Sequence, residues 1–361
     1  RLARRLRRRL GLRRYGPRRR RGLPVGSIVA VALVLAGIGT ATLLQRHRDR
    51  AASDALAEYV RQRGVPPAEL AAHAGWRHRA VFLADVPTAI SPKRHAADAV
   101  EALAAGPGLD VVVLAVPSDR QPLVDRYLRT EPEEPGILLA DPATVHGRSA
   151  AARAYLEIYR TVWRLNRTRP PARRIRVLAV DPPNWPPDTG LPPRVLAHRY
   201  ARRDAYMAER LEREIYRRAP GARALFFMEG YHGLKRGHGE LRYGGGPPVR
   251  VRWLAERLRG EGLTDVYTIL TDAYIRPSAV GAAITYGATR VGALLRPRLA
   301  GAAAALAVPI DERFDFLGPA LREADGPGLG LQLRPEGYRL RDLADAYIFP
   351  GSTGGRPRAS R

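Results

Sequence analysis

The sequence predicts an α/β fold: a mostly parallel sheet with helices on both of its faces, preceded by one N-terminal transmembrane helix. Three observations predict this. After residue 50, short runs rich in Val, Ile, Leu and Phe alternate with longer amphipathic segments. The short runs are apolar throughout, as expected for strands of a parallel sheet that is covered on both sides. Finally, an uncharged segment, residues 23–45, directly follows an arginine-rich block.

The first 45 residues resemble a membrane anchor. Residues 1–22 carry 12 arginines and no acid, and a helix over residues 23–45 would be about 34 Å long, enough to cross a bilayer core. The positive-inside rule places residues 1–22 in the cytoplasm and the main domain outside it, in the single-pass orientation of a bacterial cell-membrane protein. A cleaved signal peptide and a buried core helix are the alternatives.

The composition excludes several classes of function. The chain lacks cysteine, which excludes disulfides, thiolate zinc sites and a cysteine nucleophile. Its formal net charge of +26 would suit nucleic-acid binding, but the arginines are scattered among acids and no nucleic-acid-binding motif is recognisable. We therefore expect no nucleic-acid partner. Of the 61 basic residues only Lys93 and Lys235 are lysines, which indicates a chain that uses Arg wherever a positive charge is tolerated.

The repeating elements define one α/β domain over residues 51–350, followed by a tail, residues 351–361, that we expect to be disordered. The predicted strands are residues 80–86, 110–116, 136–141, 175–181, 223–230, 265–273 and 345–351. The predicted helices are residues 51–62, 93–105, 120–130, 148–167, 199–219 and 249–262. Several repeat apolar residues at helical spacing, as Tyr155, Ile158, Tyr159, Val162 and Leu165 do.

Polar residues gather where the predicted strands end. The strand ends carry Asp85, Asp119, Asp141, Asp181, Glu229 to His232, and Asp272. In a parallel sheet, ligands bind beyond the carboxyl ends of the strands, so at least two of these side chains should face one cleft. Asp119 and Asp141 also precede helices, where Asp is a common N-cap.

His232 is the histidine best placed for function. It follows a core strand through Gly230, and a histidine there can act as a ligand or a base, although a histidine satisfied within a turn is the alternative. Lys93 and Lys235 follow two of the strands. A lysine retained in such a chain indicates a place where a compact amine is needed, unless the placement is chance.

Residues 80–273 resemble the superfamily of erythromycin esterases, ChaN haem-binding proteins and TraB/Tiki proteins. The resemblance rests on residues 81–128, on "RYARRDAYMAERL" (199–211) and on "FFMEGYHGLKRGHGE" (226–240). The second segment is similar to the family's Arg-Asp/Asn-x-x-Met helix and the third to its second Gly-x-x-His motif. The chain departs from the pattern at Pro87, where the family has His, at Ala115, where it tends to have Glu, and at Glu229, where it has Gly.

The resemblance implies a set of site residues. In the family, paired His and Glu side chains bind a metal or act as a general base, and ChaN members bind haem. The residues carried over or expected from their place on the rim are Asp85, Arg203, Glu229 and His232 as catalytic groups, His232 and Asp85 as metal ligands, and Tyr231, Lys235, Lys93, Gln121 and Asp181 as ligand-binding groups, with Asp204 also matching the helix motif.

Two kinds of function stay open at this point. The first is a membrane-anchored, extracytoplasmic protein that binds haem, a divalent metal or another small molecule, or that has a degenerate site; Tyr231 and His232 would then ligate haem. The alternative is a hydrolase that acts on an ester or peptide bond. In it, Asp85, Glu229 and His232 would activate water directly or through a metal, and Arg203 would stabilise a developing anion.

Overall fold

The computed structural model describes residues 43–44, 47–87, 89–188, 190–236, 238–243, 249–271, 295, 297–299, 304–317, 329–334 and 338–349. The chain divides into two units, residues 1–51 and 52–361, and the α/β fold belongs to the second. The expected anchor, residues 23–45, lies outside the described residues except for Leu43 and Leu44. Within the described ranges no helix is both long and apolar enough to span a membrane. The anchor and the extracytoplasmic location stay predictions.

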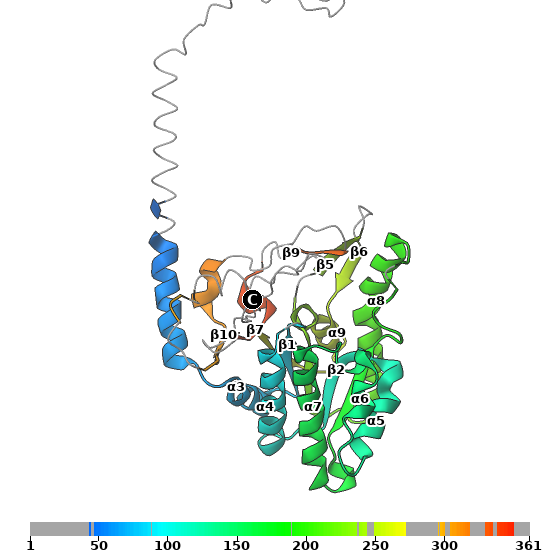
Figure 1. Ribbon diagram of the computed structural model, residues 1–361. Coiled ribbons are helices and arrows are strands. Elements are labelled where there is room, and N and C mark those ends of the chain that lie inside the picture. The colour runs from blue at the N-terminus through cyan, green and yellow to red at the C-terminus, as the bar shows by residue number, and fades with distance from the viewer. Residues whose placement is uncertain are drawn as a thin grey trace, which may run out of the picture. The chain divides into compact units, whose positions relative to one another are not determined.

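The core of the second unit is a seven-stranded sheet in the order β3-β2-β4-β1-β7-β10-β8 (Figure 1). Its strands are β1 (Ala80–Asp85), β2 (Val111–Pro117), β3 (Arg176–Asp181), β4 (Ala224–Glu229), β7 (Val266–Thr271), β8 (Leu306–Pro309) and β10 (Ala346–Phe349). The paired strands are parallel except for β10 and β8. Every residue of β1 and of β2 is buried, which explains why these strands are apolar throughout.

Helices cover both faces of this sheet. On one face, α3 (Pro67–Arg77), α4 (Ser91–Ala105), α5 (Gln121–Arg129), α6 (Gly136–Leu139) and α7 (Ala150–Arg167) share a core with Leu83 and Phe227. On the other, α8 (Pro193–Leu211) and α9 (Leu254–Gly260) pack on Phe82 and Phe226. Neighbouring residues of one strand therefore serve different layers, as strand alternation requires.

The remaining described elements are short. A second, antiparallel sheet contains β5 (His238–Tyr243), β6 (Val249–Arg252) and β9 (Leu329–Arg334), in the order β6-β5-β9. Single turns follow or precede the longer elements: η1 (Ser118–Arg120), η2 (Pro142–Thr144), η3 (Pro171–Arg173), the π-helical η4 (Glu212–Tyr216), η5 (Gly230–Gly233), η6 (Glu312–Leu317) and α11 (Leu340–Leu343). The helical residues 52–63 contribute Leu56 and Val60 to a third cluster with β10.

Most predicted strands form, but two assignments were wrong. Residues 136–141 form the single turn α6 and end at Asp141, the N-cap of η2, rather than forming a strand. Only Leu138 of α6 is buried, so the short apolar run lacks the burial of a core strand. Residues 249–252 form β6 before α9 begins, because "VRVR" alternates with the period of a strand. Asp272 and the tail lie outside the described residues.

Candidate functional site

Three carboxylates lie at the carboxyl edge of the sheet and on the same side of it. Asp85 and Glu229 end the neighbouring strands β1 and β4 and are partners in register. Each comes two residues after a side chain in the α7-side core, Leu83 or Phe227, so both are directed toward that layer. Asp181 ends β3 and follows Ala179 in the same alternation. The parallel sheet therefore assembles this group, as the sequence predicts.

Asp85 is held by a buried lysine. The Nζ atom of Lys93 in α4 donates to Asp85 Oδ1 at 2.5 Å and to the carbonyl oxygens of Val86 and Pro87 at 2.7 and 3.1 Å. An ammonium has three donors, so this one is fully used. Burial raises the pKa of Asp85 in spite of Lys93 and lowers the pKa of Lys93 in spite of Asp85. The Lys93 ammonium therefore has no donor left for a ligand at the end of β1.

Arg203 ties the ends of β3 and β4 together. It lies in α8, and its Nε and Nη2 atoms donate to the two oxygens of Asp181 at 2.6 and 2.8 Å. Its Nη1 atom donates to the Tyr231 hydroxyl at 2.9 Å, and its Nη2 atom lies 3.4 Å from Glu229 Oε2. The guanidinium carbon lies 4.8 Å from the centre of the Trp185 ring. The Arg203 guanidinium therefore holds the carboxylates of Asp181 and Glu229 in place.

His232 forms the middle of a chain of three side chains. Its Nδ1 atom lies 2.8 Å from Asp204 Oδ1, which also accepts from the backbone nitrogen of Leu254 at 2.7 Å. With Nδ1–H donated to Asp204, the neutral ring presents a lone pair at Nε2. That Nε2 atom is buried, lies 3.6 Å from Glu229 Oε2, and has no hydrogen-bond partner within the described part of the chain. Two acceptors thus face each other at 3.6 Å, and the neutral ring has no hydrogen to donate to the carboxylate.

A close backbone approach positions this histidine. The turn η5 packs on β1 at Gly233, where an added Cβ atom would come within 2.5 Å of the Phe82 ring. The Gly233 carbonyl oxygen also accepts from Thr268 Oγ1 at 2.7 Å. Glycine is therefore required immediately after His232, at a position that sequence reasoning did not single out.

Glu229 is the ionised and accessible member of the chain. Burial alone would raise its pKa, but Arg203 first, and then His232 and His146, lower it to about 2. The Glu229 side chain is 21% exposed, whereas the His232 side chain is 1% exposed. A ligand entering from solvent would therefore meet the Glu229 carboxylate before it reached His232.

Two residues at this site were not predicted from the sequence. His146 is exposed, has a φ of 56°, and lies with its ring centre 4.7 Å from that of Tyr155 in α7. The Tyr155 hydroxyl is buried and, among the described residues, has no hydrogen-bond partner. Burial, then the fields of Tyr159 and of the three rim carboxylates, keep the pKa of Tyr155 well above its usual range. The following Gly147 is the one signal in the sequence that could have marked this loop.

Two of the expected ligand-binding residues are engaged elsewhere. The Gln121 amide donates to the carbonyl oxygen of Val177 and accepts from the backbone nitrogen of Ala179, both in β3, at 2.8 Å each. Lys235 forms an ion pair with Asp345, next to β10, and its backbone nitrogen donates to the Leu343 carbonyl oxygen at 3.0 Å. Neither side chain is directed at Glu229 or His232 by these contacts.

The expected metal pair of His232 and Asp85 does not form a ligand set in this arrangement. Asp85 forms a buried ion pair with Lys93, and Nδ1 of His232 lies at hydrogen-bond distance from Asp204. The described residues contain no group of three or more His, Cys, Asp or Glu side chains arranged to hold a metal ion. Haem does not fit either, because an axial ligand needs an accessible donor atom, Nε2 of His232 is buried, and the Tyr231 hydroxyl accepts from Arg203.

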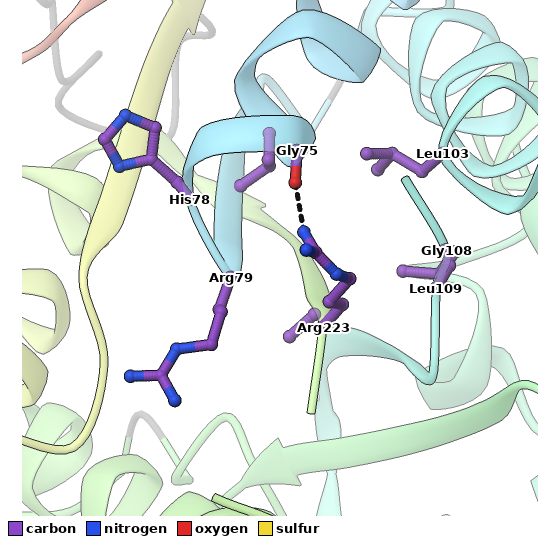
Figure 2. Close-up of a pocket in the computed structure, with 9 residues that line it drawn as sticks. Gly75, His78, Arg79, Leu103, Gly108, Leu109 and Arg223 are labelled. Atoms are coloured by element: carbon purple, nitrogen blue, oxygen red, sulfur yellow. Dashed lines mark hydrogen bonds between the residues drawn. The ribbon is translucent and has the colours of Figure 1, made fainter. Parts of the chain in front are cut away.

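A small pocket lies at the opposite, amino edge of the sheet (Figure 2). Gly75, Leu103, Gly108 and Arg223 are among its lining residues, and Arg223 Nη1 donates to the Gly75 carbonyl oxygen. Its volume of about 10 Å³ is that of a single water molecule. This pocket offers no room for a substrate.

The solved structures that are similar to this chain include members of the groups that its sequence resembles. No family model matches the sequence, and no curated protein matches it. Similar solved structures include an erythromycin esterase, EreC, at 9% identity and a TM-score of 0.48 over 78% of this chain and 92% of that one. A Bacillus cereus protein has 10% identity and a TM-score of 0.48, covering 83% and 97%. Haem-binding ChaN of Campylobacter jejuni has 10% identity and a TM-score of 0.36, covering 58% and 87%. At these identities and scores no activity is transferred to this chain.

Proposed function

We propose that the second unit is a hydrolase-like α/β domain in which Asp204, His232 and Glu229 activate water for attack on a small ester. The observation that carries this proposal is the Nε2 atom of His232, which has no hydrogen-bond partner among the described residues and lies 3.6 Å from an ionised and partly exposed carboxylate. A water molecule beside the pair, within hydrogen-bond distance of both atoms, would donate one hydrogen to each acceptor. Such a water is oriented and polarised at once, which is what general base catalysis requires.

The low pKa of Glu229 decides which group takes the proton. A carboxylate with a pKa of about 2 is a poor base. The lone pair at Nε2 of His232 is therefore the acceptor of the proton, and Glu229 orients the water. Asp204 then stabilises the imidazolium, as a carboxylate behind a histidine base does.

The reaction is balanced without further reagents. One water proton moves to Nε2 of His232, and the water oxygen bonds to the ester carbonyl carbon. The bond from that carbon to the leaving alcohol oxygen then breaks, and the imidazolium returns its proton to that oxygen. Arg203 holds Glu229 and Asp181 throughout, because its donors are already committed to them.

A second candidate, ligand capture without turnover, is favoured by a different observation. The His232 side chain is almost completely buried, so the base is not open to bulk water. Trp185, Tyr231 and Trp253 surround the Arg203 and His232 side chains with aromatic rings. Rings beside a few fixed polar groups are typical of small-molecule sites.

Hydrolysis of p-nitrophenyl esters and of erythromycin by the full-length chain separates the two candidates. We expect turnover that falls by about 10²- to 10⁴-fold in His232→Asn and in Glu229→Gln, the usual contribution of a general base. His78→Asn is the matched control, because His78 forms a similar pair with Asp265 at 2.6 Å, next to the amino end of β1. Wild-type turnover that both site variants retain would contradict the hydrolase proposal, and no wild-type turnover would favour ligand capture.

A further inference from the structure

Two buried polar atoms near Glu229 are unsatisfied, and they are of opposite kinds. Nε2 of His232 is an acceptor, and the Tyr155 hydroxyl is a donor as well as an acceptor. Neither has a hydrogen-bond partner among the residues that the structure describes. Leaving a buried polar group unpaired is costly, so a native protein that keeps two of them near one carboxylate indicates a ligand that satisfies both.

The Tyr155 side chain belongs to the same side of the rim as the carboxylates. It lies near the start of α7, whose Ser149 N-cap accepts from the Ala152 backbone nitrogen. Its ring centre is 5.7 Å from that of Phe227, which lies two residues before Glu229 on the same face of β4. Burial first, and then Tyr159 and the rim carboxylates, raise the pKa of Tyr155, so at working pH its hydroxyl remains an O–H donor.

We infer that the Tyr155 hydroxyl donates a hydrogen bond to the carbonyl oxygen of a neutral ester, while His232 takes the proton of the attacking water. This inference rests on the proposed function and names a further catalytic residue and a substrate class for it. When water adds, the carbonyl oxygen becomes negative, and a donor fixed in advance stabilises that charge. Lys93 and Arg203 compensate the nearest carboxylates, which limits their repulsion of the new anion.

Charge selects a neutral substrate over an anionic one. Asp85, Asp181, Asp204 and Glu229 contribute four negative charges, and Lys93 and Arg203 two positive ones. The remaining balance, with His232 neutral, is −2. An acid such as benzoate would be repelled, whereas an uncharged ester or amide of similar size would not.

His146 lies where such a substrate would enter. It is exposed, and its ring lies edge-on to the buried Tyr155 ring at 4.7 Å. The left-handed backbone of His146 and Gly147 fixes this loop immediately before α7.

A neighbouring tyrosine provides a matched control. Tyr159 lies one turn later in α7, is equally buried, and donates its hydroxyl to the Thr144 carbonyl oxygen at 2.7 Å. For Tyr155→Phe in the full-length chain we expect kcat to fall about 100-fold, the effect of losing one oxyanion donor, with little change in KM and no loss of melting temperature. For Tyr159→Phe we expect the reverse: a lower melting temperature with kcat unchanged.

The outcomes separate this inference from the proposed function. A Tyr155→Phe variant with wild-type kcat, while His232→Asn is inactive, would overturn the role of Tyr155 alone. A melting temperature lowered as much as in Tyr159→Phe would show that the Tyr155 hydroxyl has a structural partner instead.

A chain without esterase activity still tests the inference through binding. Ligand-observed NMR with acetanilide, a neutral amide, and benzoate, an anion, is the assay. We expect acetanilide to bind the wild type and to bind Tyr155→Phe about tenfold more weakly, the worth of one neutral hydrogen bond, and benzoate to bind neither. Equal acetanilide binding by both proteins, or benzoate binding, would overturn it.

Discussion

The ends of β1 and β4 carry two buried acid–base pairs on neighbouring strands, and they differ in what they leave unsatisfied. At the end of β1, Lys93 uses its three donors on Asp85 and two carbonyl oxygens. At the end of β4, His232 is fixed through Nδ1, and Nε2 faces Glu229 without a bond. Both pairs combine an acid with a base, yet only the second has a free atom with which to do chemistry.

This difference shows that a shifted pKa alone does not identify a functional site. Burial shifts the pKa values of Asp85 and Lys93, and both are placed on the rim where ligands bind in such folds. Their hydrogen bonds are nevertheless complete, so the pair can be explained by structure alone. The pair at β4 cannot, because it leaves an acceptor directed at an accessible carboxylate.

The largest effect is expected from removing Lys93 from its buried ion pair with Asp85. Lys93→Met would leave Asp85 buried without its partner, and removing one member of a buried ion pair typically costs about 3–5 kcal/mol in the free energy of unfolding. Urea denaturation followed by circular dichroism measures this cost. In the double variant Lys93→Met/Asp85→Leu we expect most of the loss to be recovered, since an apolar replacement removes both charges. A loss below about 1 kcal/mol in the single variant would show that Lys93 and Asp85 contribute no more than an exposed ion pair does.

The next effect concerns the pH dependence of stability that comes from the ionisation of Glu229. The pKa of Glu229 is lowered from 4.5 to about 2 in the folded chain, so the stabilisation from its ionised form is complete above pH 4.5 and is lost as the pH falls toward 2. The total is at most about 3 kcal/mol. We expect the wild type to lose more stability than Glu229→Gln over this pH range, measured by chemical denaturation at each pH. Parallel pH profiles would mean that Arg203 does not hold Glu229 ionised.

The smallest effect is expected at Lys235. This residue follows His232 by three positions, but its ammonium is directed at Asp345, in a pair whose side chains are 14% and 24% exposed. Lys235→Arg keeps the charge, so we expect a change in unfolding free energy below about 1 kcal/mol and a kcat close to that of the wild type. A kcat reduced more than about tenfold would return Lys235 to the ligand set that the sequence suggests.

The sequence predicted the parallel sheet well because its strands are apolar throughout. Strand ends were placed correctly for the same reason, so Asp85, Asp181 and Glu229 were expected on one rim, and the structure brings them together with Arg203 and His232. The run at residues 136–141 failed because four to six apolar residues do not distinguish a strand from a helical turn. The second sheet depends on pairing between distant segments, which local patterns do not show.

The missed side chains have a different cause. Tyr155 belongs to the apolar stripe of α7, so periodicity assigned it to the core, where its ring indeed lies. Only the three-dimensional arrangement shows that its hydroxyl lacks a partner in the part of the chain that the structure describes. His146 lies in a loop whose conformation depends on a left-handed residue pair, and a single histidine in such a loop has no spacing from which a role could be inferred.

The Gln121 side chain has a role away from the site, because it binds backbone groups of the edge strand β3. Arg176 N donates to Asp110 on the β2 side, so the peptide groups of Val177 and Ala179 point outward from the edge strand β3. Gln121 binds two of these groups, and Arg210 Nε donates to a third, the Ala179 carbonyl oxygen, at 2.8 Å. An edge satisfied in this way offers little to a strand from a second molecule. The same amide that the sequence suggested as a ligand contact thus protects the protein from edge-to-edge aggregation.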